Sequence, residues 1–417
     1  MSMSTATAMN ADRSPTPGPL AGLKVIELAT ARAGSFAGTV LADLGADVVK
    51  VEGGRYAPAW GYEAEDDRIA FDRNKRSVVI DVEHPTGREV LYRLLAKSDV
   101  LLDEYQTDDL IRLCLDEITL RDAAPHLVHC SITPFGAAPL SETPKVDSTS
   151  AELVVQALSG NMDLTGDAGG PPFELGIPLS DLGAGIYAVI GVLGAVVGGG
   201  SAGQHSRVEI AKMDVAVALL SYMAVGYFAD GESPTRVGTG HATIFPYNAF
   251  RARDGEVVVA PFTQRFWRNF CAATGRTDLT QVDTYKDFAS RIREKEVLLK
   301  LFEPILAQKT VAEWVEIFRQ ADVPAGPVLT VQGALELAHT VERELTPSFP
   351  LENGEYTRSA GSPFKFHYAD GASYVPTVRR PPGRGEDTVT VLAAMGHDRG
   401  EIAELIATGA VSQKMER

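Results

Sequence analysis

Short apolar runs alternate with longer amphipathic stretches over the first half of the chain. The runs are rich in Val, Ile and Leu and have the length of buried strands. They lie at 23–28, 47–52, 74–81, 99–103, 127–133 and 206–210. Apolar residues at helical spacing predict helices at 36–44, 85–97, 108–115 and 215–228, and a turn is predicted at 30–35. Strands that alternate with helices in this way predict an α/β domain with a parallel sheet.

The pattern changes at Asp230–Pro234, where polar residues, Gly and Pro interrupt the apolar positions. Two strand-like runs and three amphipathic helices follow, which predict a smaller α+β domain. The strand-like runs lie at 246–250 and 255–260, and the helices near 264–274, 287–307 and 310–321. We therefore predict a disordered tail at 1–18, the first part of a large domain at 19–228, a small domain at 229–330, and a return to the large domain at 331–417.

One glycine-rich stretch, Gly176–Gly194, stands out from its surroundings. Its small residues recur every three or four positions, so they share a helix face on which another backbone can approach closely. Ser180 is the predicted N-cap, which places Asp181 in the first turn, where free N–H groups favour a carboxylate. From spacing alone, a helix-capping role and a functional role for Asp181 are equally supported.

Composition and charge narrow the classes of protein. The formal net charge of −16 over 417 residues argues against a nucleic-acid-binding protein, which would carry a basic face. The three cysteines lie far apart without metal-type spacing, so we predict no metal site and a reducing, cytoplasmic location. The longest apolar stretch, 182–197, is shorter than the roughly 20 residues that span a membrane. We therefore expect neither a nucleic acid nor a membrane as a partner.

Several motifs, in one order, resemble the class III coenzyme A transferases, a family that also contains the α-methylacyl-CoA racemases. The resemblance covers about residues 19–410. The motifs are Pro19–Leu28, Ala33-Gly34, Leu41–Glu52, Asn74–Ser77, Ser131–Gly136, Gln156–Gly160, Thr165-Gly166, Gly170–Pro172, Asp181–Gly185, Gly238–Pro246, Pro324–Pro327, Ser362–Phe366 and Gly385–Thr388.

The resemblance implies a large Rossmann-like domain, built from both chain ends, with a smaller inserted domain. Members are typically dimers whose two chains interlock, so a homodimer is expected, with a heteromer as the alternative. The implied substrates are an acyl-CoA and a free carboxylic acid, and no cofactor beyond coenzyme A is needed.

The resemblance also assigns catalytic residues. The family's nucleophilic aspartate matches Asp181, which would attack an acyl-CoA thioester and carry first an anhydride and then a CoA thioester. Glu152 matches an acidic position near that nucleophile and is expected to orient groups around the anhydride; a surface acid is the alternative. Racemase activity is a competing hypothesis, but the family's catalytic histidine is replaced by Ala151. A third hypothesis is a non-catalytic subunit of a heteromeric transferase.

The resemblance also implies which residues contact coenzyme A, because they occupy positions that match the family's contact residues. These residues are Ala31, Arg32, Ile80, Glu104, Tyr105, Arg112 and Leu113, with Arg55 as a substitute for a missing basic residue at Gly53. Arg32 and Arg112 are expected to meet phosphates, and Tyr105 the adenine or the pantetheine arm. A further hypothesis is that Arg32 binds the second carboxylate of a dicarboxylic substrate.

Overall fold

The computed structural model describes residues 16–29, 31–53, 65–137, 143–146, 151–199 and 204–413. The chain forms two compact units. Unit 1 consists of Met1–Gly160, Leu175–Tyr222 and Glu342–Arg417, and unit 2 of Asn161–Glu174 and Met223–Val341. Both chain ends thus belong to unit 1, as the resemblance implied. The predicted boundaries at 228 and 330 stay predictions, although unit 2 also takes in the short stretch 161–174.

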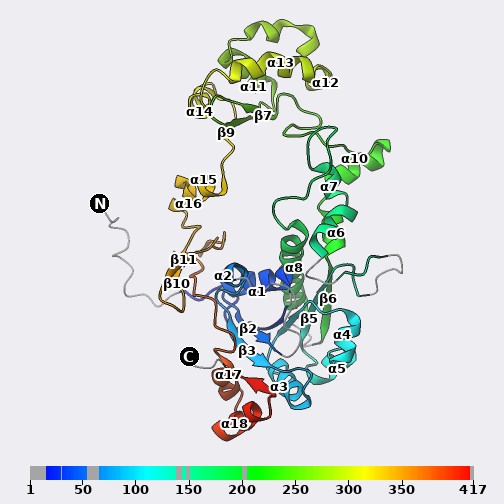
Figure 1. Cartoon of the computed structure of the whole chain (residues 1–417), viewed down its shortest axis with the longest axis vertical. Coiled ribbons are helices and arrows are strands. Elements are labelled where there is room, and N and C mark those ends of the chain that lie inside the picture. The colour runs from blue at the N-terminus through cyan, green and yellow to red at the C-terminus, as the bar shows by residue number, and fades with distance from the viewer. Residues whose placement is uncertain are drawn as a thin grey trace, which may run out of the picture. The chain divides into compact units, whose positions relative to one another are not determined.

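A seven-stranded sheet forms the centre of unit 1 (Figure 1). Its strands are β1 (Lys24–Leu28), β2 (Asp47–Glu52), β3 (Arg76–Ile80), β4 (Val100–Asp103), β5 (Val128–Thr133), β6 (Ser206–Ala211) and β14 (Val411–Ser412). They follow the order β14-β3-β2-β1-β4-β5-β6, and all neighbours are parallel except β14, which pairs antiparallel with β3. The predicted α/β fold with a mainly parallel sheet is confirmed.

Helices cover both faces of this sheet, which explains why its strands are almost continuously apolar. In β1, Val25 packs with one face, whereas Ile26 and Leu28 pack with the other. The first face carries α1 (Arg32–Asp43) and α8 (Leu179–Gly199). The second carries α3 (Pro85–Leu95), α4 (Thr107–Arg112), α5 (Glu117–Ala123), α17 (Thr388–Ala394) and α18 (Arg399–Ala407).

The C-terminal segment completes this second face. Figure 1 shows α17 and α18, in red, beside the blue strands of the N-terminal half. Val391 and Leu392 of α17, and Ile402 of α18, are buried in the same core as β3. The Asp387 carboxylate accepts a hydrogen bond from the backbone N–H of Ser77 at 2.9 Å, which fixes this segment to β3.

A buried charge network anchors α1 to the sheet. Lys75, which directly precedes β3, lies 2.7 Å from Glu27 of β1 and 3.3 Å from Asp72. It also donates to the Ser35 carbonyl of α1 at 2.9 Å. A side chain at Gly38 would bring a Cβ within 1.8 Å of the Glu27 carboxylate, so glycine is required where α1 crosses β1. The network thereby fixes the position of the α1 N-terminus.

Strand order creates a switch point between β1 and β4. From β1 the chain moves to β2 and β3 on one side, and from β4 it moves to β5 and β6 on the other. This is the 3-2-1-4-5-6 order of Rossmann-type sheets, whose ligands bind outside the carboxyl ends of the strands at such a point. The sheet therefore predicts a site beyond Leu28 and Asp103, which are register partners at the ends of β1 and β4.

The structure differs from the prediction at residues 30–35, at helix α5 (Glu117–Ala123) and at residues 215–228. The predicted turn at 30–35 is wrong beyond Ala31, because α1 begins at Arg32. Helix α5 was not predicted. The predicted continuous helix at 215–228 is also wrong, since α9 (Lys212–Ala218) ends before Ser221, whose φ is 47°, and α10 (Tyr222–Asp230) begins anew. The break coincides with the boundary between the two units.

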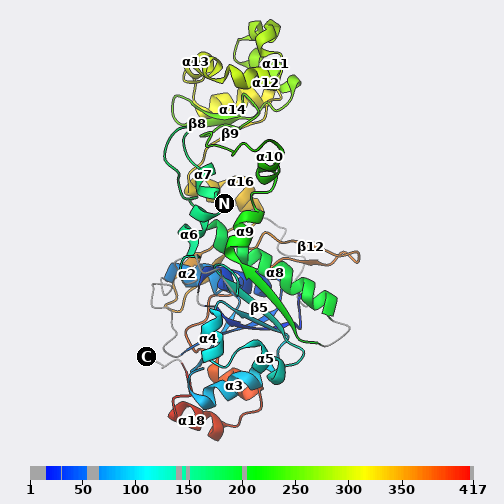
Figure 2. The same cartoon turned by 90° about the vertical axis from the view of Figure 1, so that its right-hand side faces the viewer.

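Helix α8 is longer than expected. It has 21 residues, so the prediction that its apolar stretch is too short to span a membrane is wrong on length. By length and composition α8 qualifies as a span, and the bent pair α9–α10 would count as a second. In the fold, Ala184, Ala188 and Val192 of α8 are buried on the sheet with α1, so α8 serves as a core helix of unit 1 (Figure 2).

The remaining elements of unit 1 are short. They are α2 (Glu65–Phe71), α6 (Ala151–Leu158) and the hairpins β10–β11 (Ser348–Pro350, Tyr356–Arg358) and β12–β13 (Phe366–His367, Ser373–Tyr374). The sequence near 349–366 also predicts a hairpin, and the first observed hairpin overlaps that stretch.

Unit 2 is an α+β structure with its own aromatic core. Its three-stranded antiparallel sheet and principal helices are β7 (Asn248–Arg251), β8 (Glu256–Val259), β9 (Ala325–Pro327), α11 (Gln264–Ala273), α12 (Phe288–Arg293), α13 (Lys295–Leu306) and α14 (Val311–Gln320). Trp267, Phe270, Phe302 and Phe318 pack together in its centre. Short helices α7 (Asn161–Leu164), α15 (Val331–Glu336) and α16 (Ala338–Glu342) lie near the ends of its segments.

Candidate active site

Three buried ionisable side chains meet beyond the carboxyl edge of the unit 1 sheet. Asp181 lies in the first turn of α8, Lys212 directly follows β6, and Glu104 directly follows β4. The Lys212 Nζ atom is 2.6 Å from Asp181 Oδ1 and 3.9 Å from Glu104 Oε1. Lys212 and Glu104 are buried, and Asp181 is only 2% exposed. The Lys212 ammonium thus forms ion pairs with two acids in a site that is nearly closed to water.

A fourth buried acid, Glu152 of α6, caps helix α8. Its carboxylate accepts hydrogen bonds from the backbone N–H groups of Ser180 at 3.1 Å and Asp181 at 2.8 Å. It also accepts from the Ser180 hydroxyl at 2.5 Å and from the Gln156 amide at 2.6 Å. The predicted N-cap Ser180 is therefore wrong: α8 already begins at Leu179, and a carboxylate from another helix caps it.

This capping changes what the helix terminus can do. The first amides of a helix can stabilise developing negative charge, but those of Ser180 and Asp181 in α8 already donate to Glu152. The Leu182 N–H donates to the Pro178 carbonyl. The positive group next to Asp181 is instead the Lys212 ammonium. Glu152 is also not the surface acid that the alternative interpretation supposed, because it is buried.

Burial governs the protonation of these acids. It raises the pKa of Asp181 above the ordinary aspartate value, and Lys212 opposes part of that rise. Burial also raises the pKa of Glu104 to about 7, a rise that Lys212 opposes and Asp181 increases. Near neutral pH, Glu104 can therefore bind or release a proton, and Asp181 is a weaker acid than an exposed aspartate. Buried acids with perturbed pKa values are typical of sites that do acid–base or nucleophilic chemistry.

Glycines let the elements around the site approach closely. A Cβ at Gly185 would lie 2.8 Å from the Ala33 carbonyl oxygen and 3.0 Å from the Phe36 ring, so α8 packs directly on α1. A Cβ at Gly34 would lie 3.0 Å from Glu104. The prediction that the small-residue face of α8 admits another backbone is confirmed.

The structure brings some predicted coenzyme A contacts to this site. The Ala31 N–H donates to Glu104 Oε2 at 2.7 Å, which joins the start of α1 to the end of β4. Arg32, the first residue of α1, has a side chain that is 44% exposed and lies 3.3 Å from Asp67. Its positive charge also opposes part of the rise in the pKa of Asp181. Ala31 and Arg32 therefore border the cluster of Asp181, Lys212 and Glu104.

The other predicted contacts lie elsewhere in unit 1. Ile80, Tyr105 and Leu113 are buried in the core beneath α3. Arg112 is half-exposed and forms ion pairs with Glu83 at 2.7 Å and Asp109 at 3.0 Å. Arg55 lies outside the described residues. The role of all these residues in binding coenzyme A stays a prediction.

Sequence reasoning missed Lys212. The sequence contains an indication of its role. Lys212 lies between the strand ending at Ile210 and an apolar helix, and the apolar residues on both sides predict that this segment is buried. A lysine in such a place needs a buried acid. Its position after β6 puts it at the same sheet edge as residues that follow β1 and β4.

Residues 20–388, most of the chain, match the family described as CoA-transferase family III. The chain is a member of CoA-transferase family III. A succinyl-CoA:mesaconate CoA-transferase of Haloarcula hispanica is 32% identical to it over 367 residues, which cover 84% of this chain and 90% of the relative. A succinate–glutarate CoA-transferase of Agrobacterium fabrum is 30% identical over 349 residues, covering 81% and 86%.

A solved structure supports the same assignment. The crystal structure of a CaiB/BaiF family protein from Brucella suis matches with a TM-score of 0.78 and 28% identity, covering 91% of this chain and all of that one. The predicted family and enzyme class are thus confirmed. This CoA-transferase moves coenzyme A between acids, and its cluster around Asp181 lies where a Rossmann-type sheet binds its ligand.

Proposed function

We propose that this CoA-transferase works by covalent catalysis on Asp181. The observation that carries the proposal is a nearly water-free carboxylate, paired with a single buried lysine, at the switch point of a Rossmann-type sheet. An exclusion of water is what the chemistry needs, because anhydrides and thioesters are lost by hydrolysis.

The proposed sequence uses one carboxyl group throughout. The Asp181 carboxylate attacks the thioester carbonyl of the donor; the C–S bond breaks, and a mixed anhydride and CoA thiolate form. The thiolate then attacks the Asp181 carbonyl, the anhydride C–O bond breaks, and the donor acid leaves. An acceptor carboxylate attacks the resulting aspartyl thioester and expels the thiolate. The thiolate finally attacks the acceptor carbonyl, which yields the new acyl-CoA and restores Asp181.

The surrounding residues support these steps in distinct ways. Lys212 favours the ionised form of Asp181 and orients it, since its Nζ contacts one carboxylate oxygen. Glu152 holds the first turn of α8 in place through the backbone of Ser180 and Asp181. These are positioning roles, because neither residue forms a bond to the acyl group.

Trapping of the intermediate tests this proposal. The enzyme is incubated with succinyl-CoA and no acceptor, then treated with hydroxylamine or borohydride, and its peptides are analysed by mass spectrometry. We expect the modification on the peptide that contains Asp181. A stoichiometric modification at Glu152 or Glu104 instead would overturn the assignment.

We also propose dicarboxylic acids as the substrate class. Both relatives named above act, by their names, on dicarboxylic acids or their CoA esters. Arg32 provides a partly exposed guanidinium next to the Asp181 cluster, suited to a second carboxylate. This carboxylate would replace Asp67 as the partner of Arg32.

Substitution Arg32→Met is expected to raise the KM for dicarboxylate acceptors by roughly 10- to 100-fold, the effect of one lost charge-assisted hydrogen bond. KM for a monocarboxylate of similar length should change little, and any effect on Asp181 itself should be common to both acceptors. The measurement is the ratio of kcat/KM for the two acceptors, with the exposed Arg93→Met as the matched control. An unchanged ratio contradicts this role of Arg32.

A homodimer is proposed from the surface of α8. Ile186, Ile190 and Val197 form an exposed stripe along this helix, and Tyr187 lies beside it. Exposed apolar stripes of this kind mark interaction surfaces, and the apolar length of α8 suits a second copy of the chain. Light scattering should give the mass of two chains, and Ile190→Glu should lower it. A single-chain mass for the unmodified protein at micromolar concentration excludes the dimer.

A further inference from the structure

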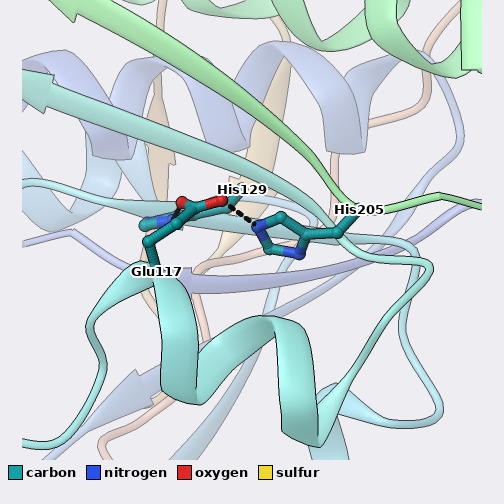
Figure 3. A group of neighbouring side chains, drawn as sticks. All are labelled: Glu117, His129 and His205. Carbon is teal, nitrogen blue, oxygen red and sulfur yellow. Dashed lines mark ion pairs between the residues drawn. The ribbon is translucent and has the colours of Figure 1, made fainter.

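A second cluster of ionisable side chains lies at the amino edge of the sheet, at the opposite ends of the strands from Asp181. Glu117 is the first residue of α5, His129 is the second residue of β5, and His205 directly precedes β6. Figure 3 shows the three side chains converging from these separate elements. Neither the transfer chemistry nor the family assignment gives this cluster a role.

The ligand atoms of the three residues are close together. His205 Nε2 lies 3.0 Å from Glu117 Oε1, His129 Nδ1 lies 3.9 Å from Glu117 Oε2, and all three ligand atoms fall within 4.8 Å of one another. The two histidine side chains are at least 95% buried. Glu117 Oε2, His129 Nδ1 and both ring nitrogens of His205 are buried without a well-aligned hydrogen bond to any described residue.

His129 is held as a metal ligand would be held. Its Nε2 atom lies 2.5 Å from Asp103 Oδ2, and Asp103 in turn accepts from the Ser131 hydroxyl and the Tyr105 backbone N–H. With a proton on Nε2 donated to Asp103, His129 presents the lone pair of Nδ1 towards the Glu117 carboxylate. A carboxylate behind a metal-bound histidine, which fixes its tautomer and orientation, is the usual outer partner in metal sites.

The lone pair of His129 Nδ1 and the negatively charged Glu117 carboxylate repel each other in this buried place unless a cation lies between them. A tetrahedral zinc ion with bonds of about 2.0–2.2 Å holds its ligand atoms roughly 3.4 Å apart. The distances of 3.0 and 3.9 Å from His205 and His129 to the two carboxylate oxygens of Glu117 bracket this spacing. Imidazole nitrogens favour zinc and its neighbours in the first transition row over magnesium or calcium.

We propose that Glu117, His129 and His205 bind a divalent transition-metal ion, zinc foremost. Two histidines and a glutamate leave a fourth position for water, on the partly exposed side of Glu117. The ion joins α5 to the amino ends of β5 and β6 and stabilises unit 1. It takes no part in the transfer at Asp181, and it revises the prediction from cysteine spacing that the chain holds no metal.

Cobalt binding tests the site, because Co²⁺ substitutes for Zn²⁺ and gives visible absorption in a tetrahedral environment. The full-length, tag-free chain is freed of metal with EDTA, exchanged into chelator-free buffer and titrated with Co²⁺. We expect one ion per chain, displaced by Zn²⁺, and a higher Tm with Zn²⁺ than without, because an ion that binds the folded state stabilises it.

His205→Gln and Glu117→Gln are the diagnostic variants, since both residues lie at the margin of the cluster and the fold should tolerate them. Each should weaken Co²⁺ binding by at least roughly 100-fold and abolish the rise in Tm. Loss of a residue that only hydrogen-bonds a metal ligand weakens binding less than this. His367→Gln, an exposed histidine of β12 in the same unit, is the matched control and should bind as the unmodified chain does. Absence of a stoichiometric Co²⁺ spectrum, or binding equal in all these proteins, overturns the proposal.

Discussion

Asp181→Asn is expected to eliminate CoA transfer, with a fall in kcat of roughly 1000-fold or more, as for the loss of other covalent nucleophiles. Asparagine preserves the shape of the side chain and still offers an oxygen to Lys212, so the fold should be kept. The measurements are steady-state transfer from succinyl-CoA to a dicarboxylate and trapping of the acylated peptide. Both signals should disappear together, because the same carboxyl group carries the acyl group and the CoA.

Asp214→Asn is the matched control, because Asp214 is an exposed acid in the first turn of α9, two residues after Lys212. It should leave transfer and trapping unchanged. Persistent turnover in Asp181→Asn, with a normal fold, would refute the nucleophile assignment even though membership of the family would stand.

Lys212→Met is expected to give the second large effect, on stability and on pH dependence together. Methionine has similar volume but no charge, so Asp181 and Glu104 lose their shared buried cation. Breaking a buried pair in this way typically costs about 3–5 kcal/mol in the free energy of unfolding. Chemical denaturation monitored in unit 1 measures this loss, with the exposed Lys300→Met of unit 2 as control.

The same substitution should shift the pH profile. Asp181 attacks only when ionised, so kcat/KM falls as the pH drops through its pKa. Burial raises the pKa of Asp181 and Lys212 opposes that rise, so removal of Lys212 raises the pKa further. The acid limb of kcat/KM should therefore move to higher pH in Lys212→Met.

A double variant keeps this prediction testable where Lys212→Met alone folds poorly. Glu104→Gln removes the charge of one of the two acids that lose their shared cation in Lys212→Met, and Gln retains an oxygen for the Ala31 N–H. Lys212→Met with Glu104→Gln should therefore be more stable than Lys212→Met. A single variant with unaltered stability and an unaltered acid limb would show that Lys212 is not the charge partner of Asp181.

The parallel strands of unit 1 were predictable to within one or two residues for a physical reason. Strands that lie between two layers of helices are mostly apolar, so their runs of Val, Ile and Leu show both their place and their ends. Helix α5 lacked such a signal, because Leu120 alone is buried among its seven residues. The break before Tyr222 was also hidden, since Ser221 adopts a left-handed conformation without any Gly or Pro nearby to predict it.

The candidate site was predictable only in part, because its contacts are long-range. Asp181 and Glu152 were named from motifs, yet the role of Glu152 as a cap depends on α6 reaching the start of α8, 28 residues away. Lys212 meets Asp181 only because β6 ends at the sheet edge where α8 begins. Local patterns identify residues of this kind, whereas topology decides which of them become neighbours.

The antiparallel strand β14 has a consequence for synthesis of the protein. Val411 and Ser412, which close the outer edge of β3, are translated after every other strand of this sheet. Unit 2 ends at Val341 and is translated before them, so it can fold before the sheet is closed. Until β14 emerges from the ribosome, β3 keeps an open hydrogen-bonding edge, and in that interval neighbouring chains on a polysome are able to pair with it.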